Sequence, residues 1–355
     1  MKAAQRGLLG VPLLLVCALA AGCFGPGPRP VEWGRGRAYL VGINYPWLHY
    51  GHDFGANAWG HDGVSAPDSR RTVEADFAYL QSQGVQVVRW FVFGDARAAP
   101  QFGPDGRATG LGDFFYRDFD AALALARLYD VRLIPVLFDF TLADKAVVEG
   151  GVQLGGRAAL IADPAKRRAL LDRALLPLLL RYGTEPHILA WDVINEPEGA
   201  MTIPGGGWVA EPVSAAAMQA FVGEVTGYVH RYAMQPVTVG SAWRRGLVYW
   251  RGLGLDFYQF HYYDERDGEY RLDLPAASAD LDRPTIVGEF PTRKTRATVP
   301  QYLDAIWRAG YAGALPWGDS PADTPSNFRQ VARDVGVWAR AQASHLDLTP
   351  WREAR

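Results

Sequence analysis

Two short strings in the sequence each end an apolar, β-branched run with a glutamate. Residues 191–197 read WDVINEP, and residues 286–290 read IVGEF. Such runs are typical of buried parallel strands that present a carboxylate at their C-terminal end. If Glu196 and Glu289 face each other, one can donate a proton to a glycosidic oxygen while the other attacks or stabilises the sugar cation. The alternative is that both are ordinary surface glutamates at strand ends.

Several polar side chains lie near the ends of other apolar runs. Arg89 lies inside such a run, where a charge is costly unless it is paired. Asn195 directly precedes Glu196, and its amide suits a hydrogen bond to a sugar 2-hydroxyl. His261 and Tyr263 are two residues apart and therefore share one face of their strand. All four are candidate substrate-binding residues.

Further candidates to line a sugar subsite are aromatic or acidic. Tyr45 and Trp47 follow the first apolar run, Asp139 follows the third and Trp317 the eighth. Trp243 is an additional candidate for a flanking subsite. Sugar rings stack their apolar faces on indole and phenol rings, which favours this role. For Tyr45 and Trp47 the alternative is packing in the mouth of the fold.

The elements that must position these side chains alternate along the chain. From Ala38 onward, strand-like and helix-like stretches follow one another, and residues 38–345 fit a single α/β domain. The expected architecture is a (β/α)8 TIM barrel, in which all eight strands end on one face. The eight expected strands are residues 39–45, 85–93, 131–138, 188–195, 236–240, 256–262, 285–289 and 313–317.

Apolar residues recur at helical spacing between most of these strands. The first stripe stops at Gly84. A long helix opens at Asp163-Pro164 and runs to Gly183, with a kink expected at Pro177. The helices after the fifth and sixth strands are expected to be short. The remaining stripes include Phe119, Leu123, Phe221, Val225, Tyr302, Leu303, Val331 and Val335.

Together the motifs resemble those of clan A glycoside hydrolases, most nearly glycoside hydrolase family 5. The resemblance implies a retaining β-glycoside hydrolase with Glu289 as the nucleophile and Glu196 as the acid/base. It also implies that Arg89 keeps the nucleophile ionised and that the Tyr263 hydroxyl bonds to it. In the family, the histidine at the place of His261 lies near the acid/base.

The resemblance extends to the eighth strand but is incomplete at the third. Trp317 matches the tryptophan floor beneath the cleaved sugar. Family 5 enzymes often carry a histidine near the end of the third strand, where this chain has Asp139, which we expect to contact a sugar hydroxyl. The flat faces of β-linked hexoses favour β-glucan or β-mannan-type substrates. The alternatives are a transglycosylase, or a catalytically silent glycan-binding lipoprotein.

Composition agrees with a carbohydrate partner. The 355 residues include 12 Trp and 16 Tyr, and the formal net charge is −2. No Lys/Arg block stands out, which argues against a nucleic-acid partner. Two carboxylates and water suffice for glycoside hydrolysis, so we expect no cofactor. We also expect a monomer.

A histidine-rich loop follows the first expected strand. It contains His49, His52, Asp53, His61 and Asp62. These residue types can bind a metal, but the segment is Gly-rich and lacks the His-x-x-x-His spacing of a helical site. We therefore expect a role in the cleft or a plain loop, and no metal.

The N-terminus is typical of an exported lipoprotein. Lys2 and Arg6 precede a short apolar run over residues 8–21, and the following Gly22-Cys23 resembles the end of a bacterial lipobox. The alternative is a plain secretory signal cleaved near Ala21.

We expect four segments along the chain. Residues 1–22 form the signal peptide, and Cys23 is the lipidation site at the head of a Gly/Pro-rich tether, 23–37. The catalytic barrel follows, and residues 346–355 form a C-terminal tail. The expected location is the cell envelope, at the outer membrane of a Gram-negative cell, or the medium if the protein is secreted.

Overall fold

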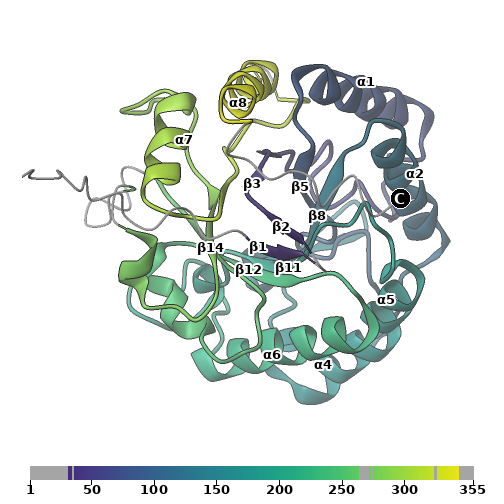
Figure 1. The fold of residues 1–355 in the computed structure, drawn as a ribbon. Coiled ribbons are helices and arrows are strands. Elements are labelled where there is room, and N and C mark those ends of the chain that lie inside the picture. The colour runs from purple at the N-terminus through teal and green to yellow at the C-terminus, as the bar shows by residue number, and fades with distance from the viewer. Residues whose placement is uncertain (1–30, 34–35, 264–271, 273–274, 324–325, 344–355) are drawn as a thin grey trace, which may run out of the picture.

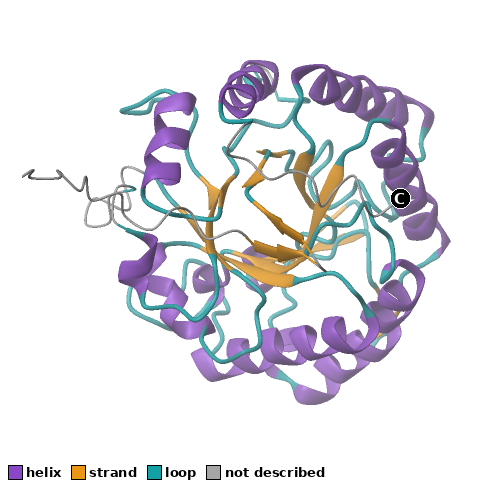
Figure 2. Ribbon diagram, in the orientation of Figure 1, coloured by secondary structure: helices purple, strands orange, loops and turns teal. Residues whose placement is uncertain are grey.

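The computed structural model is a barrel of parallel strands surrounded by helices (Figures 1 and 2). It describes residues 31–33, 36–263, 272, 275–323 and 326–343. Nine short segments form the sheet in the order β3-β15-β14-β13-β12-β11-β8-β5-β4. The first and last segments, β3 (Leu40–Val41) and β4 (Ile43–Asn44), are consecutive in the chain. The sheet therefore closes on itself with eight strand positions, which confirms the predicted single (β/α)8 domain.

Gly42 divides the first strand into these two segments. A Cβ at this position would lie 2.1 Å from the carbonyl oxygen of Val87 on the neighbouring strand. Only glycine allows the two backbones to approach this closely.

The other strands lie where the apolar runs predicted them, within a few residues at each end. They are β5 (Val87–Phe91), β8 (Arg132–Asp139), β11 (Trp191–Asn195), β12 (Val237–Ser241), β13 (Tyr258–His261), β14 (Thr285–Glu289) and β15 (Gly313–Ala314).

The main helices of the outer ring are α1 (Pro67–Gln83), α2 (Asp113–Leu128), α4 (Pro164–Leu170), α5 (Leu176–Tyr182), α6 (Ala215–Tyr232), α7 (Val299–Arg308) and α8 (Phe328–Ala341). Helix α1 shows why the periodicity was informative: Val73, Phe77 and Leu80 are fully buried against the sheet. The helix ends at Gly84, which adopts the left-handed conformation with φ 78°. The fifth strand is followed by the short 3-10 helix η4 (Arg244–Trp250), and η5 (Ala276–Ala279) follows the sixth.

The long helix predicted over residues 164–182 is interrupted near Pro177, as expected. Asp163 caps its start by accepting bonds from the backbone N–H groups of Ala165 and Lys166. Between α4 and α5 lies a wider π-helical turn, η2 (Leu171–Leu175). Proline cannot donate a backbone hydrogen bond, and its ring crowds the preceding turn. The widened turn lies next to Pro177 and makes room for it.

Three two-stranded ribbons were not predicted, because each strand has only two or three residues. They pair β1 (Val31–Trp33) with β2 (Gly36–Ala38), β6 (Gln101–Phe102) with β7 (Ala108–Gly110), and β9 (Val147–Glu149) with β10 (Val152–Leu154). The β1–β2 ribbon overlaps the predicted tether. Within the described residues, Val31–Trp33 pairs with Gly36–Ala38, at the C-terminal end of the segment 23–37 that was expected to be a linker.

The remaining predictions at the termini lie outside the described residues. They are the signal peptide over residues 1–22, the lipid site at Cys23 and the tail over residues 346–355. No helix in the described part of the chain is both long enough and apolar enough to cross a bilayer.

The barrel interior is divided into an apolar layer and a polar layer. Val87 belongs to a buried cluster that also includes Ile134 and Phe257. Arg89, two residues further along the same strand, shares the inward face with Val87. The polar layer therefore lies between the apolar layer and the C-terminal ends of the strands, which is the end where the active sites of barrel enzymes lie.

Candidate active site

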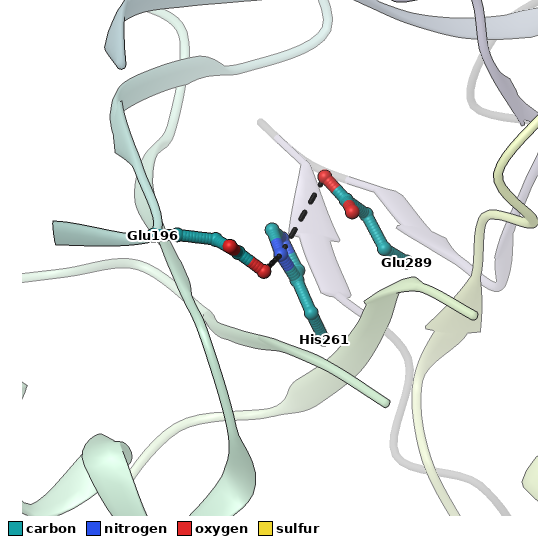
Figure 3. A group of neighbouring side chains, drawn as sticks. All are labelled: Glu196, His261 and Glu289. Carbon is teal, nitrogen blue, oxygen red and sulfur yellow. Dashed lines mark hydrogen bonds and ion pairs between the residues drawn. The ribbon is translucent and has the colours of Figure 1, made fainter. Parts of the chain in front are cut away.

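Glu196 and Glu289 lie opposite each other at the C-terminal ends of two barrel strands, with His261 between them (Figure 3). Nδ1 of His261 is 3.0 Å from Oε1 of Glu196 and 3.5 Å from Oε1 of Glu289. One carboxylate oxygen of each glutamate and the histidine nitrogen all lie within 4.8 Å of one another. Carboxylates accept hydrogen bonds, so this arrangement assigns a proton to Nδ1.

The separation of the two carboxylates indicates which glycosidase mechanism they can support. Carboxyl groups about 5–5.5 Å apart leave no room for a water between sugar and nucleophile, whereas inverting enzymes space them about 6.5–9.5 Å apart. The short distance between Glu196 and Glu289 fits the retaining arrangement.

Glu289 is held by a cation and a hydroxyl. Nη1 of Arg89 donates to its Oε1 at 2.7 Å, and the Tyr263 hydroxyl donates to its Oε2 at 2.8 Å. Each carboxylate oxygen of Glu289 is therefore engaged in a hydrogen bond, one of them from a charged donor. The structure brings Arg89 and Tyr263 to the places that the sequence predicted.

Arg89 is the centre of a buried network. Its Nε donates to Asp192 at 2.9 Å, its Nη1 also reaches Asn44 at 2.9 Å, and its Nη2 donates to Asn195 at 2.8 Å. Burial alone would lower the pKa of Arg89, but the charges of Asp192 and Glu289 outweigh burial and raise it. The buried guanidinium thus has two carboxylate partners, and one of them is Glu289.

Glycine at position 240 makes room for this network. A Cβ there would lie 2.8 Å from Nη2 of Arg89 and 3.2 Å from Nε2 of His261.

Asn195 and Asp139 form a second pair beside the carboxylates. The Asn195 amide nitrogen donates to Asp139 at 2.8 Å, which leaves its second hydrogen for a ligand. Asp139 also accepts from the Tyr50 hydroxyl at 3.1 Å and from the Thr141 hydroxyl at 2.7 Å. Burial raises the pKa of Asp139, and the bonds from Thr141 and Asn195 oppose it. Asp139 lines the cavity, but its contacts identify it first as support for Asn195.

The backbone of Glu196 is unusual. Its φ and ψ are 44° and 49°, the left-handed conformation, which costs energy for any residue except glycine. Its N–H donates to the carbonyl of Gly240 at 2.7 Å. Strained residues of this kind persist where the surrounding structure fixes them, and they gather at functional sites.

Aromatic side chains form the walls of the cavity, which has a volume of about 320 Å³. Trp317 and Trp47 are both half-buried, and their ring centres are 5.9 Å apart at a steep angle. The cavity is lined by Trp47, Tyr50, Phe91, Asp139, Phe140, Thr141, Asn195, Glu196, Tyr263, Glu289 and Trp317. Trp47, Trp317 and Asp139 therefore line the cavity, and their contact with a sugar stays a prediction.

Tyr45 does not reach the cavity, which corrects its prediction as a subsite residue. It is fully buried among Phe77, Trp90 and Phe328, and its hydroxyl donates to Asp76 at 2.9 Å. Side chains alternate along a strand, so the inward position of Asn44 forces Tyr45 outward. This alternation was available in the sequence and could have excluded Tyr45.

Trp243 is not among the residues that line the cavity. Its ring centre is 5.5 Å from that of Trp208, which in turn is 5.4 Å from Phe140 at the cavity wall. Trp243 is itself buried, with 5% of its surface exposed, so it packs behind the cavity wall and offers no open ring face to a sugar.

The histidine-rich loop does not assemble one site. His49 approaches Asp53 at 3.7 Å, whereas His61 bonds to Asp118 at 2.9 Å. Tyr50, from this loop, was missed by the sequence analysis because no periodicity determines the path of a loop. Its neighbour Trp47, whose ring centre lies 4.8 Å away, was the available signal.

Within the described part of the chain, Glu196, His261 and Glu289 form the one group whose ligand atoms could share a metal ion. The guanidinium of Arg89 already neutralises Glu289 at 2.7 Å. One oxygen of Glu289 is therefore already engaged by a cationic side chain, an arrangement that fits acid/base and nucleophilic chemistry.

Comparison with known proteins agrees with this geometry. No family model matches the chain. Mannan endo-1,4-β-mannosidases from Mytilus edulis and Cryptopygus antarcticus are each 25% identical to it, covering 82% and 83% of this chain and 87% and 85% of theirs. The structure of an endo-1,4-β-mannanase from Eisenia fetida has a TM-score of 0.72 at 22% identity, covering 87% of this chain and 95% of its own. The chain resembles the clan A glycoside hydrolases, and within them family 5.

Proposed function

We propose that this protein is a retaining, endo-acting β-1,4-mannan hydrolase. The observation that carries the proposal is the pair Glu196 and Glu289, bridged by His261 at retaining distance, with Glu289 paired to Arg89. The two curated relatives are named for endo-hydrolysis of β-mannan and supply the choice of substrate.

The first chemical step forms a glycosyl ester. An oxygen of the ionised Glu289 attacks the anomeric carbon, and the bond from that carbon to the glycosidic oxygen breaks. Glu196 gives its proton to the departing oxygen. The hydrogen bonds from Arg89 and Tyr263 hold the attacking carboxylate in place before the sugar arrives.

The second step reverses these roles. Glu196, now ionised, takes a proton from water as the water oxygen attacks the anomeric carbon, and the ester bond to Glu289 breaks. His261 donates from Nδ1 and can stabilise the negative charge that Glu196 acquires between the steps. Two inversions return the original anomeric configuration.

The cavity walls suit a β-linked hexose chain. Trp317 offers a half-buried indole beside the carboxylates, where the ring of the cleaved sugar must lie. Asn195 retains one amide hydrogen for the 2-hydroxyl, which is axial in mannose and equatorial in glucose. The hydrogen bond from Asn195 therefore differs in geometry between mannan and glucan.

The test is product analysis with purified enzyme. Incubation with linear β-1,4-mannan, a soluble β-1,4-glucan and an α-glucan should release oligosaccharides from the mannan first, with retained anomeric configuration by NMR. Cleavage of α-glucan without activity on any β-glycoside would overturn the proposal.

The retained pair of glutamates speaks against a silent glycan-binding protein, which would be expected to lose one of them. A transglycosylase shares the same ester, so an added acceptor sugar separates hydrolysis from transfer.

We further propose that the enzyme acts as a monomer attached to the cell envelope through lipid on Cys23. The support is the lipobox-like sequence before that residue. Stable anchoring needs more than one acyl chain. Cys23→Ser should release the enzyme from the membrane fraction, and a wild-type protein already soluble in the periplasm or medium would contradict the anchor.

A further inference from the structure

A second glutamate lies close to the acid/base in sequence and has no role in the chemistry described above. Glu198 is two residues after Glu196, on the 3-10 turn η3 (Pro197–Ala200), and its side chain is fully buried. Burying a carboxylate is costly unless hydrogen bonds compensate. A residue of this kind therefore needs an explanation.

Three neutral donors surround the Glu198 carboxylate. The Ser241 hydroxyl donates at 2.5 Å, the backbone N–H of Ala242 at 2.8 Å and Nε1 of Trp250 at 3.0 Å. Burial raises the pKa of Glu198, and these donors oppose the rise. No charged partner lies among its described contacts, so the carboxyl acts as a multiple hydrogen-bond acceptor.

The surrounding chain is shaped to admit this carboxyl. A Cβ on Gly246 would lie 2.4 Å from Oε1 of Glu198 and 2.6 Å from the Ser241 hydroxyl oxygen. Glycine at position 246 thus leaves the space that the carboxyl fills.

These contacts tie together three successive segments at the active-site face. Glu198 belongs to the turn after β11, Ser241 ends β12, and Trp250 ends η4. The same two strands are joined at Glu196 itself, whose N–H donates to the carbonyl of Gly240. The strained residue is therefore held on both sides: at its own N–H, and two residues further on through Glu198.

We propose that Glu198 is a positioning residue that holds Glu196 in its left-handed conformation and so aims the acid/base carboxyl at the glycosidic oxygen. The left-handed conformation of Glu196 is energetically unfavourable for a residue with a side chain, so local contacts must offset its cost. The hydrogen bonds of Glu198 to β12 and η4 are suited to offset it. This inference rests on the proposed function of Glu196.

The test compares two substrates with different leaving groups in the Glu198→Gln variant. Mannohexaose needs a proton from the acid, whereas a 2,4-dinitrophenyl β-mannoside has a leaving group that departs without one. General acid catalysis contributes about 10²–10⁴-fold, so a misaligned acid should lower kcat/KM on mannohexaose by roughly 10–100-fold. On the dinitrophenyl substrate, the loss should stay below about threefold, because the nucleophile is untouched.

Asp118→Asn is the matched control. Asp118 is also fully buried and also accepts several bonds, from the backbone N–H groups of Gly55 and Ser65 and from the Ser65 hydroxyl. It anchors the loop after the first strand instead of the turn that carries Glu196. Its replacement should lower stability and affect both substrates equally.

Equal losses on both substrates in Glu198→Gln, or no loss on mannohexaose, would overturn the inference. If Glu198→Gln does not fold, Ser241→Ala removes a single donor and should show the same substrate difference at smaller size. Wild-type enzyme inactive on both mannosides would instead contradict the proposed function. The crystal structure of Glu198→Gln tests the positioning role directly. An unchanged positive φ at Glu196 in the variant would overturn that role.

Discussion

The two glutamates of the site lie at the same end of one barrel, on strands separated by two others, yet their surroundings differ. Glu289 completes a regular strand and receives a guanidinium on one oxygen and a phenol on the other. Glu196 lies just beyond its strand in a left-handed turn and faces Nδ1 of His261. A fixed cationic partner suits the proposed nucleophile, whereas an imidazole within hydrogen-bond distance suits the proposed acid/base. The contacts of the two glutamates therefore support the two different roles that we propose for them.

Removing the nucleophile should have the largest effect. Glu289→Ala should lower kcat/KM on mannan by roughly 10⁵-fold or more, the scale seen when an enzyme nucleophile is deleted. The reason is that alanine has no carboxylate to attack the anomeric carbon, and Arg89 would lose its partner. Added azide should restore some turnover and give product of inverted configuration, measured by NMR. Residual activity within tenfold of wild type would refute the assignment.

Removing the acid/base should have a smaller and more selective effect. Glu196→Ala should lose about 10²–10⁴-fold on mannan, the usual contribution of a general acid. With an activated aryl mannoside the first step should be nearly unchanged, so a burst of phenol should precede slow turnover. Azide should then accelerate turnover with retained configuration. Equal rates of Glu289→Ala and Glu196→Ala on the aryl mannoside would contradict the different roles proposed for the two glutamates.

The surroundings of Glu289 could be predicted from the sequence better than those of Glu196. Glu289 and its strand were placed correctly, because the apolar run and the following polar residue mark a parallel strand end. Arg89 was recognisable because a charge in a buried strand requires a partner. The left-handed turn at Glu196 and the contacts of Glu198 depend on residues from β12 and η4, which no local pattern reveals.

The features that the sequence did not predict also depend on contacts between distant segments or on the path of a loop. The break at Gly42 depends on the approach of Val87 from another strand. Tyr45 was wrongly assigned to the cleft because its position relative to Asn44 was not considered. Tyr50 lies on a loop, where neither a period of two nor one of 3.6 applies.

Two carboxyls outside the site also differ in their surroundings. Asp76 is buried beside Tyr45, and burial raises its pKa to about 6, against the bond from Tyr45 and the charge of Arg329. Glu185 is the opposite case: burial would raise its pKa, but bonds from His187 and Arg127 outweigh burial and lower it to about 2.

The two shifts predict opposite pH dependences of stability. The folded protein binds the Asp76 proton more tightly than the unfolded chain does, so wild type loses stability as pH rises from about 4 to 6. Asparagine cannot ionise, so Asp76→Asn should gain roughly 2–3 kcal/mol relative to wild type across this window, by urea unfolding. Glu185→Gln should instead lose stability relative to wild type as pH rises from about 2 to 5. The same sign for both variants would contradict the assigned environments.

The smallest predicted effect separates the aromatic residue of the cavity from the aromatic residue of the core. Trp317 lines the cavity and is half-buried, whereas Tyr45 is enclosed by the core. Stacking beneath the reacting sugar should strengthen in the transition state, so Trp317→Ala should lower kcat/KM on mannan by about tenfold with little change in Tm. Tyr45→Phe removes only the bond to Asp76, and should lower stability by about 1 kcal/mol without changing kcat/KM. A loss of activity in Tyr45→Phe would contradict a purely structural role for Tyr45. A loss of stability in Trp317→Ala that matches its loss of activity would contradict a role for Trp317 in substrate binding.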